Sequence, residues 1–201
     1  MADSTRFTVL QRVLHWAMAI CILAMLFIGV GMMSTIAPTY IPLVATHKTL
    51  GVAILVLAAI RLAVRFRSGA PPLPADLPAP MKLAAELSHY ALYGLMIGMP
   101  LLGLAMLATA DYPIVLYGGI TVPRFLPQSD LLHTLTWTAH RYLAFAFFAL
   151  ILAHLAAALF HALVRRDGVF YAMAPVPSQP DRTVGQPGTA AGLSASRARS
   201  G

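Results

Sequence analysis

The sequence predicts an all-α integral membrane protein, built as a four-helix bundle with both termini in the cytoplasm. Hydrophobic residues make up 59% of the 201 residues and charged residues only 10%, whereas a soluble domain averages about 25% charged residues. Four apolar stretches are long enough to cross a bilayer, which takes about 20 residues of helix. In none of them do apolar and polar residues alternate as in the strands of a membrane barrel. Because lipid offers no hydrogen-bond partner, the backbone N–H and C=O groups must pair within the segment, so helices are expected.

The spans and loops follow in order along the chain. The Pro-rich segment 70–80 and the Gly- and Pro-bearing segment 111–127 are predicted to be loops. Residues 1–175 then form one transmembrane domain, while residues 176–201 have too few apolar side chains to pack and are predicted to be a disordered cytoplasmic tail. The predicted spans are at about residues 8–33, 43–64, 87–110 and 132–164.

The basic residues predict the orientation. The net charge is +7, but no basic stripe with interleaved aromatics is present, so nucleic acid is not an expected partner. The positive-inside rule assigns the end richer in Lys and Arg to the cytoplasm. That end carries Arg6, Arg12, Arg65, Arg67, Lys82, Arg165 and Arg166. The opposite end offers little beyond Lys48, Arg124 and Arg141.

Four histidines in or beside the spans have matching depths. His15 and His154 lie toward the cytoplasmic side of the first and fourth spans, while His47 and His140 lie toward the outer side of the second and fourth. Depth therefore pairs His15 with His154 and His47 with His140. The two histidines of the fourth span are 14 residues apart, which places them on nearly one helix face and roughly 21 Å apart along the axis. One helix can thus serve two metal centres stacked across the membrane.

The pairing favours haem over other metal groups. Two neutral imidazoles that face each other across a bundle can bind haem iron from both sides, an arrangement suited to electron transfer. A structural zinc site wants four ligands, typically with Cys among them, and the predicted spans contain no Asp or Glu for a di-iron site. Cys21 is the lone cysteine, so a haem would be held noncovalently. The alternative for each histidine is a polar residue at an interface or between helices.

Further polar residues lie near the depths of the two histidine pairs, here called the inner level (His15 and His154) and the outer level (His47 and His140). Arg61 lies about one turn inside the cytoplasmic end of the second span, and Arg12 and Arg141 lie close to His15 and His140. All three arginines are candidates for binding haem propionates, with membrane anchoring as the alternative. His89 and His161 fall near the inner level and are candidates for lining a pocket there; snorkelling at the interface is the alternative.

Taken together, these residues resemble the prokaryotic cytochrome b561 family, whose members are four-helix dihaem membrane cytochromes. The resemblance covers about Thr5 to Pro175. Its family pattern assigns the haem-ligand role to His15, His47, His140 and His154, in agreement with the pairing by depth. The motifs that carry it are Gln11-Arg12-Val13-Leu14-His15-Trp16, His47-Lys48-Thr49-Leu50-Gly51 with Arg61-Leu62, Pro71-Pro72, Ser88-His89-Tyr90, and His140 with His154 and His161.

This resemblance implies a multi-pass protein of the bacterial inner membrane with two b-type haems. Members of the family are associated with oxidising superoxide at the outer face and reducing ubiquinone, so we expect a superoxide oxidase. The outer cations Lys48, Arg124 and Arg141 would attract a small anion. His89 or His161 would hydrogen-bond the quinone near the inner haem or deliver its protons. The expected partners are membrane lipid, quinone and superoxide or another redox donor, and the sequence is compatible with a homo-oligomer.

Two alternatives stay open at this point. The first is a cytochrome b subunit that links a soluble dehydrogenase or hydrogenase to the quinone pool, which would copurify with a second redox subunit. The second is a haem-free transporter or scaffold, which would lack a haem absorption band; the absence of carboxylates within the predicted spans counts against a proton-driven carrier. The sequence does not specify the direction of electron flow.

Overall fold

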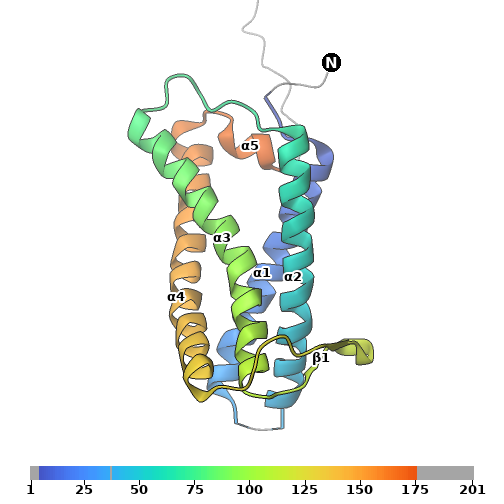
Figure 1. Ribbon diagram of the computed structural model, residues 1–201. Coiled ribbons are helices and arrows are strands. Elements are labelled where there is room, and N and C mark those ends of the chain that lie inside the picture. Colours follow the sequence, from blue (N-terminus) through green and yellow to red (C-terminus); the bar gives the residue numbers. More distant parts are fainter. Residues whose placement is uncertain (1–4, 37, 176–201) are drawn as a thin grey trace, which may run out of the picture.

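A computed structural model describes residues 5–36 and 38–175, which form an up-and-down bundle of four long helices (Figure 1). A π-helical turn, η2 (His161–Arg165), continues the fourth helix, and a short helix, α5 (Val169–Met173), follows it. All four long helices have the length and apolar composition of membrane spans. The predicted fold class, an all-α membrane four-helix bundle, is confirmed. The long helices are α1 (Val9–Ser34), α2 (Tyr40–Ser68), α3 (Ala79–Thr109) and α4 (Asp130–Phe160).

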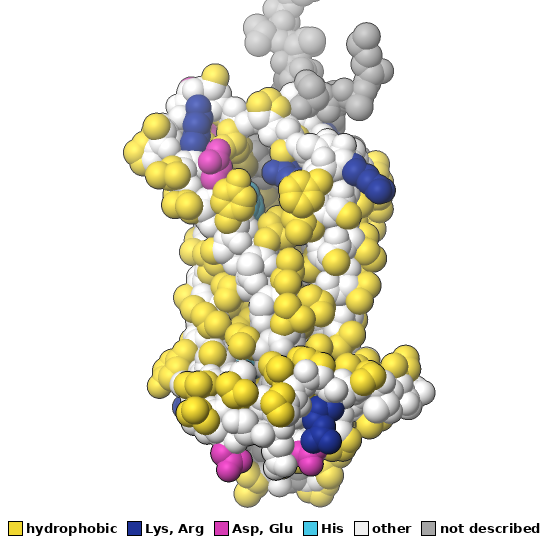
Figure 2. All heavy atoms as spheres, viewed as in Figure 1, with side chains coloured by type: hydrophobic (Ala, Val, Ile, Leu, Met, Phe, Trp, Pro, Cys, Tyr) yellow, Lys and Arg dark blue, Asp and Glu magenta, His cyan; other side chains and the backbone are white. Residues whose placement is uncertain are grey.

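The surface has the pattern of a membrane protein. In Figure 2, hydrophobic side chains cover the middle of the bundle, and the charged side chains visible on this face gather at its two ends. The helices run past the apolar stretches: α3 begins at Ala79 rather than near residue 87, and α2 ends at Ser68 rather than near residue 64. Helical hydrogen bonding continues into the interface, where water and head groups tolerate polar side chains. The predicted tail 176–201 lies outside the described residues.

The start of α1 is fixed by a reciprocal cap that also joins it to α2. The Thr8 hydroxyl accepts a hydrogen bond from the Gln11 backbone N–H at 3.2 Å, and the Gln11 side-chain oxygen accepts one from the Thr8 backbone N–H at 3.0 Å. This capping box satisfies two helix donors that would otherwise have no partner. The buried Gln11 amide then donates to the Gly69 carbonyl at 2.9 Å, so the cap also holds the cytoplasmic ends of α1 and α2 together.

The centre of the bundle is a small apolar core with one residue from each long helix. Met18, Ala58, Met96 and Phe147 form this buried cluster. Phe147 lies one heptad from both His140 and His154 on α4, so its level falls between the two histidine levels. The core therefore separates the inner end of the bundle from the outer end.

At the outer end, the connection between α3 and α4 contains a short hairpin that the sequence did not predict. Strand β1 (Ile114–Val115) pairs antiparallel with β2 (Thr121–Val122), and the 3₁₀ turn η1 (Tyr117–Gly119) joins them. Strands of two residues are too short to show an alternating pattern. The hairpin is tied to α2, because the Tyr117 backbone N–H donates to the Thr49 hydroxyl at 3.0 Å.

The cytoplasmic end is closed by α5, which lies between the ends of α4 and α2 (Figure 1). The last carbonyls of a helix have no partner within it, and here α1 and the segment just before it supply donors. Trp16 donates its indole N–H to the Met173 carbonyl at 3.0 Å, and Arg6 and Arg12 both donate to the Ala174 carbonyl at 3.2 Å. The segment after α4 is therefore docked against the first turns of α1.

Removing the central aromatic ring tests the core. Phe147→Ala is expected to lower the free energy of unfolding by on the order of 2 kcal/mol, because it leaves a cavity, while lipid tails weaken the hydrophobic driving force known from soluble cores. The matched control is Phe148→Ala, since Phe148 is 46% exposed and Phe147 only 8%. Thermal unfolding in detergent, followed by circular dichroism, measures both. Equal shifts in the two variants would contradict this assignment of the core.

Candidate functional site

Two pairs of imidazole rings face each other across the bundle, one at each histidine level. In the inner pair, the ring centroids of His15 on α1 and His154 on α4 are 6.4 Å apart, with an interplanar angle of 65°. In the outer pair, the centroids of His47 on α2 and His140 on α4 are 6.2 Å apart, at 66°. The structure thus brings together the same residues that depth matched. Their binding of iron stays a prediction.

The spacing of the rings allows a metal ion between them. A metal–imidazole bond is about 2.0 Å long and the nitrogen lies about 1.1 Å from the ring centroid, so two rings bound to one metal from opposite sides have centroids about 6 Å apart. Both pairs match this spacing. The same separation recurs at two levels, although α4 is paired with α1 at one level and with α2 at the other.

The outer pair also contains polar atoms without partners. The Nδ1 atoms of His47 and His140 are buried and make no hydrogen bond of good geometry, although the backbone of Met99 lies near the His140 ring. Gly103 on α3 backs His140, since a Cβ there would lie 3.5 Å from the ring carbon Cε1. Buried polar groups without partners are costly, so a hydrogen bond at Nδ1 is not what holds these two rings at this level. These residues therefore fit a haem with two imidazole ligands.

The inner pair has closer polar neighbours. A guanidinium nitrogen of Arg61 lies 2.7 Å from Nδ1 of His15, and Arg61 Nε donates to the Tyr93 hydroxyl at 3.0 Å. Arginine is only a donor, so Nδ1 of His15 is the acceptor here. The ring of His89 on α3 is 5.6 Å from that of His154. The inner level thus gathers three histidines and one arginine, and Tyr93 is a member that sequence reasoning missed.

The other two candidate propionate arginines have different contacts. Arg12 donates to the Ala174 carbonyl at the cytoplasmic end. Arg141 is exposed, and its guanidinium lies over the Trp137 ring at 5.5 Å from the centroid. Among the described residues, Arg61 is the candidate that hydrogen-bonds a paired histidine. A propionate role for Arg12 and Arg141 stays a prediction with no contact to support it.

His161 lies two turns beyond His154 and has an acidic partner that sequence reasoning also missed. Its Nδ1 is 2.7 Å from Oδ2 of Asp167, and Arg165 Nε donates to the same oxygen at 2.9 Å. Burial alone would raise the pKa of Asp167, but the hydrogen bonds from Arg165 and His161 outweigh it and lower the pKa below its ordinary value of 3.8. The carboxylate is therefore ionised at neutral pH.

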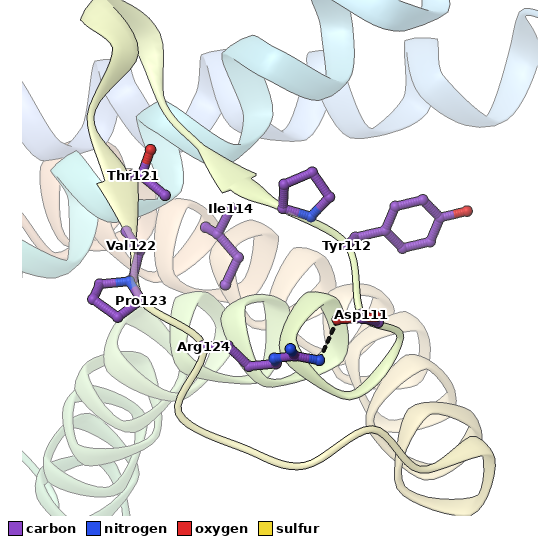
Figure 3. A pocket seen from close by; sticks show the side chains of 8 residues that line it. Asp111, Tyr112, Ile114, Thr121, Val122, Pro123 and Arg124 are labelled. Carbon is purple, nitrogen blue, oxygen red and sulfur yellow. Dashed lines mark hydrogen bonds and ion pairs between the residues drawn. The ribbon is translucent and has the colours of Figure 1, made fainter.

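A surface pocket at the outer end lies beside the hairpin. It is lined by Asp111, Tyr112, Pro113, Ile114, Thr121, Val122, Pro123 and Arg124, and Figure 3 shows Arg124 directed at Asp111. These two residues form an ion pair, so the charge of Arg124 is compensated. None of the described residues that line this pocket is a histidine. The pocket is therefore separate from the paired imidazoles.

The sequence matches the family described as prokaryotic cytochrome b561 over residues 6–175. Cytochrome b561 homolog 1 of Escherichia coli (strain K12) is 30% identical over 178 residues, which cover 85% of this chain and 97% of that protein. Cytochrome b561 homolog 2 of the same strain is 30% identical over 166 residues, with coverage of 81% and 87%. The probable superoxide oxidase CybB of Yersinia pestis is 28% identical over 172 residues, with coverage of 85% and 96%. With its four apolar helices, the chain belongs to the prokaryotic cytochrome b561 family of multi-pass electron-transfer proteins in the bacterial inner membrane.

Proposed function

We propose that this chain is a dihaem b-type cytochrome that carries electrons from superoxide at the outer face to ubiquinone at the cytoplasmic end. One observation carries the proposal: two pairs of imidazole rings lie at two levels of the bundle. Their ring centroids are 6.4 Å apart in the inner pair and 6.2 Å apart in the outer pair. A b-type haem at each level would supply reversible one-electron chemistry when bound. The protein contributes placement and electrostatics.

Each pair has a defined task in this proposal. His15 and His154 would hold the inner iron, and His47 and His140 the outer iron. The two α4 histidines lie roughly 21 Å apart along the helix, and the apolar cluster around Phe147 keeps water from the space between the levels. If His15 held the inner iron, Arg61, whose guanidinium lies 2.7 Å from the ring in this structure, would be placed to bind a haem propionate.

Superoxide as the donor is supported by charge and by kinship. The Yersinia pestis relative carries the name probable superoxide oxidase. Lys48 follows His47 directly, and Arg141 follows His140. Each proposed outer haem ligand is therefore next to a cation that attracts a small anion. Arg124 adds little, because Asp111 compensates its charge. Two superoxide ions each lose one electron to give dioxygen, and one ubiquinone takes up two electrons and two protons.

The quinone is assigned to the inner end. His89 is exposed and close to His154, and in Figure 2 a histidine side chain is visible from outside near this end of the bundle. A lipid-soluble substrate reaches the site from the side, so an opening between helices suits it. We therefore propose that His89 and His161 hydrogen-bond the quinone oxygens or exchange protons with them.

Single ligand substitutions test the two-haem assignment. His140→Ala is expected to remove the outer haem and keep the inner one, and His154→Ala to do the reverse, because each deletes one axial ligand. Pyridine haemochrome counting of the purified variants measures the loss of one haem from two. The control is His133→Ala, since His133 contacts the Met106 carbonyl rather than a second histidine. Two haems retained in either ligand variant would contradict the pairing.

Two matched lysine variants test the outer donor site. The rate at which superoxide reduces the purified protein is expected to fall about threefold in Lys48→Gln and to fall with rising salt, because steering of an anion depends on unscreened charge. Lys82→Gln at the cytoplasmic end changes the net charge equally and is expected to leave the rate unchanged. Stopped-flow absorbance of the haem bands measures it. If superoxide reduced no haem and a second redox subunit copurified, the dehydrogenase-linked alternative would replace the proposal.

A further inference from the structure

An acidic residue with a largely covered side chain, Asp167, lies beside His161 at the cytoplasmic end of α4. The side chains of His161 and Asp167 are only 12% and 10% exposed, and the ring nitrogen and the carboxylate oxygen are 2.7 Å apart. Asp167 follows the span in the sequence, where a charged residue would ordinarily face water. Its burial against a histidine therefore calls for a local cause.

The cause is an irregular turn between α4 and α5. Residues 161–165 form a π-helical turn, in which the Arg166 backbone N–H donates to the His161 carbonyl at 2.8 Å. Arg166 and Gly168 then adopt left-handed conformations, with φ of 54° and 84°. This conformation is uncommon for a residue with a side chain such as Arg166, and π turns recur at functional sites. The chain reverses here and brings Asp167 back to His161.

The carboxylate of Asp167 is held by several donors. Besides His161, it accepts hydrogen bonds from Arg165 Nε at 2.9 Å and from the Val169 backbone N–H at 3.3 Å. Arg165 also donates to Asp76 in the loop between α2 and α3 at 2.8 Å, and Asp76 is 75% exposed. Arg166 is exposed and donates to the Leu163 carbonyl, and α5 has no charged residue. The charged groups that face Asp167 are thus Arg165 and His161, with Asp76 behind Arg165.

This arrangement determines which nitrogen of His161 carries a proton. An ionised carboxylate is only an acceptor, so Nδ1 of His161 is the donor and keeps its proton. Nε2 is left as the nitrogen that can gain and release a proton. A carboxylate behind Nδ1 also compensates the positive charge that forms when Nε2 is protonated. The pair is therefore built for proton transfer at Nε2.

We propose that Asp167 is a positioning residue that orients His161 and fixes its tautomer, so that Nε2 passes protons from the cytoplasm to the quinone. The inference rests on the proposed function, because it assumes quinone reduction at the inner end. For each proton delivered, His161 Nε2–H gives its proton to a quinone oxygen and Nε2 is then reprotonated from cytoplasmic water. Asp167 stays ionised throughout, and two superoxide ions, the donor in the proposed function, supply the two electrons that the quinone requires.

The test measures electron transfer to ubiquinone in three variants of the full-length haem-loaded protein. Asp167→Asn is expected to slow quinone reduction by about tenfold or more and to change its pH profile, because a group that orients a proton donor has lost its charge. Asp167→Glu is expected to restore much of the rate. Asp76→Asn removes the exposed partner of Arg165 without touching His161 and is expected to stay within about twofold of the wild type. Haem content and the rate of haem reduction by superoxide are expected to be unchanged in all three.

The outcomes separate the inference from the proposed function. If the wild type reduced no quinone, the proposed function would fail. If the wild type were active and Asp167→Asn kept its rate and pH profile, the role of Asp167 would be wrong. A second readout does not depend on activity or on the folding of a variant: ¹⁵N NMR of histidine-labelled wild type is expected to show His161 protonated at Nδ1. A His161 protonated only at Nε2 would overturn the inference.

Discussion

The interior of a bilayer offers an imidazole no hydrogen-bond partner, so each histidine placed there must find one inside the bundle. This constraint organises the structure. Helix α4 presents His140 and His154 on nearly one face, and α2 and α1 each bring one histidine to the matching level. The spacing of both pairs matches that of two imidazoles sharing one metal ion. The small apolar core around Phe147 lies between the two levels.

The two ends of the bundle differ in ways that suit different tasks. At the outer end, the hairpin is hydrogen-bonded to Thr49 of α2, two residues from His47, and Arg124 pairs with Asp111 within the loop. At the cytoplasmic end, Arg12 and Trp16 of α1 bind backbone carbonyls at the end of α5. Arg61 contacts His15, and Asp167 contacts His161. The inner end therefore holds more proton-binding groups, which is what the proposed reduction of quinone there would require.

Much of this arrangement could be predicted from the sequence because it depends on regular helices. Heptad spacing and membrane depth were enough to match His15 with His154 and His47 with His140. The hairpin could not be predicted, because two-residue strands show no pattern. Asp167 was missed because its contact with His161 depends on a π turn and on the left-handed Arg166, neither of which has a periodic signature. Arg12 is one turn from His15 in the sequence, but it donates to the Ala174 carbonyl just after α5.

The central claim is that the two histidine pairs hold two haems in one chain. The most direct test is the reduced-minus-oxidised optical spectrum of the detergent-purified wild type, recorded together with the ratio of haem to protein. The account predicts the bands of low-spin b-type haem and two haems per chain. A protein from haem-replete cells that contained no haem, or only one per chain, would contradict it.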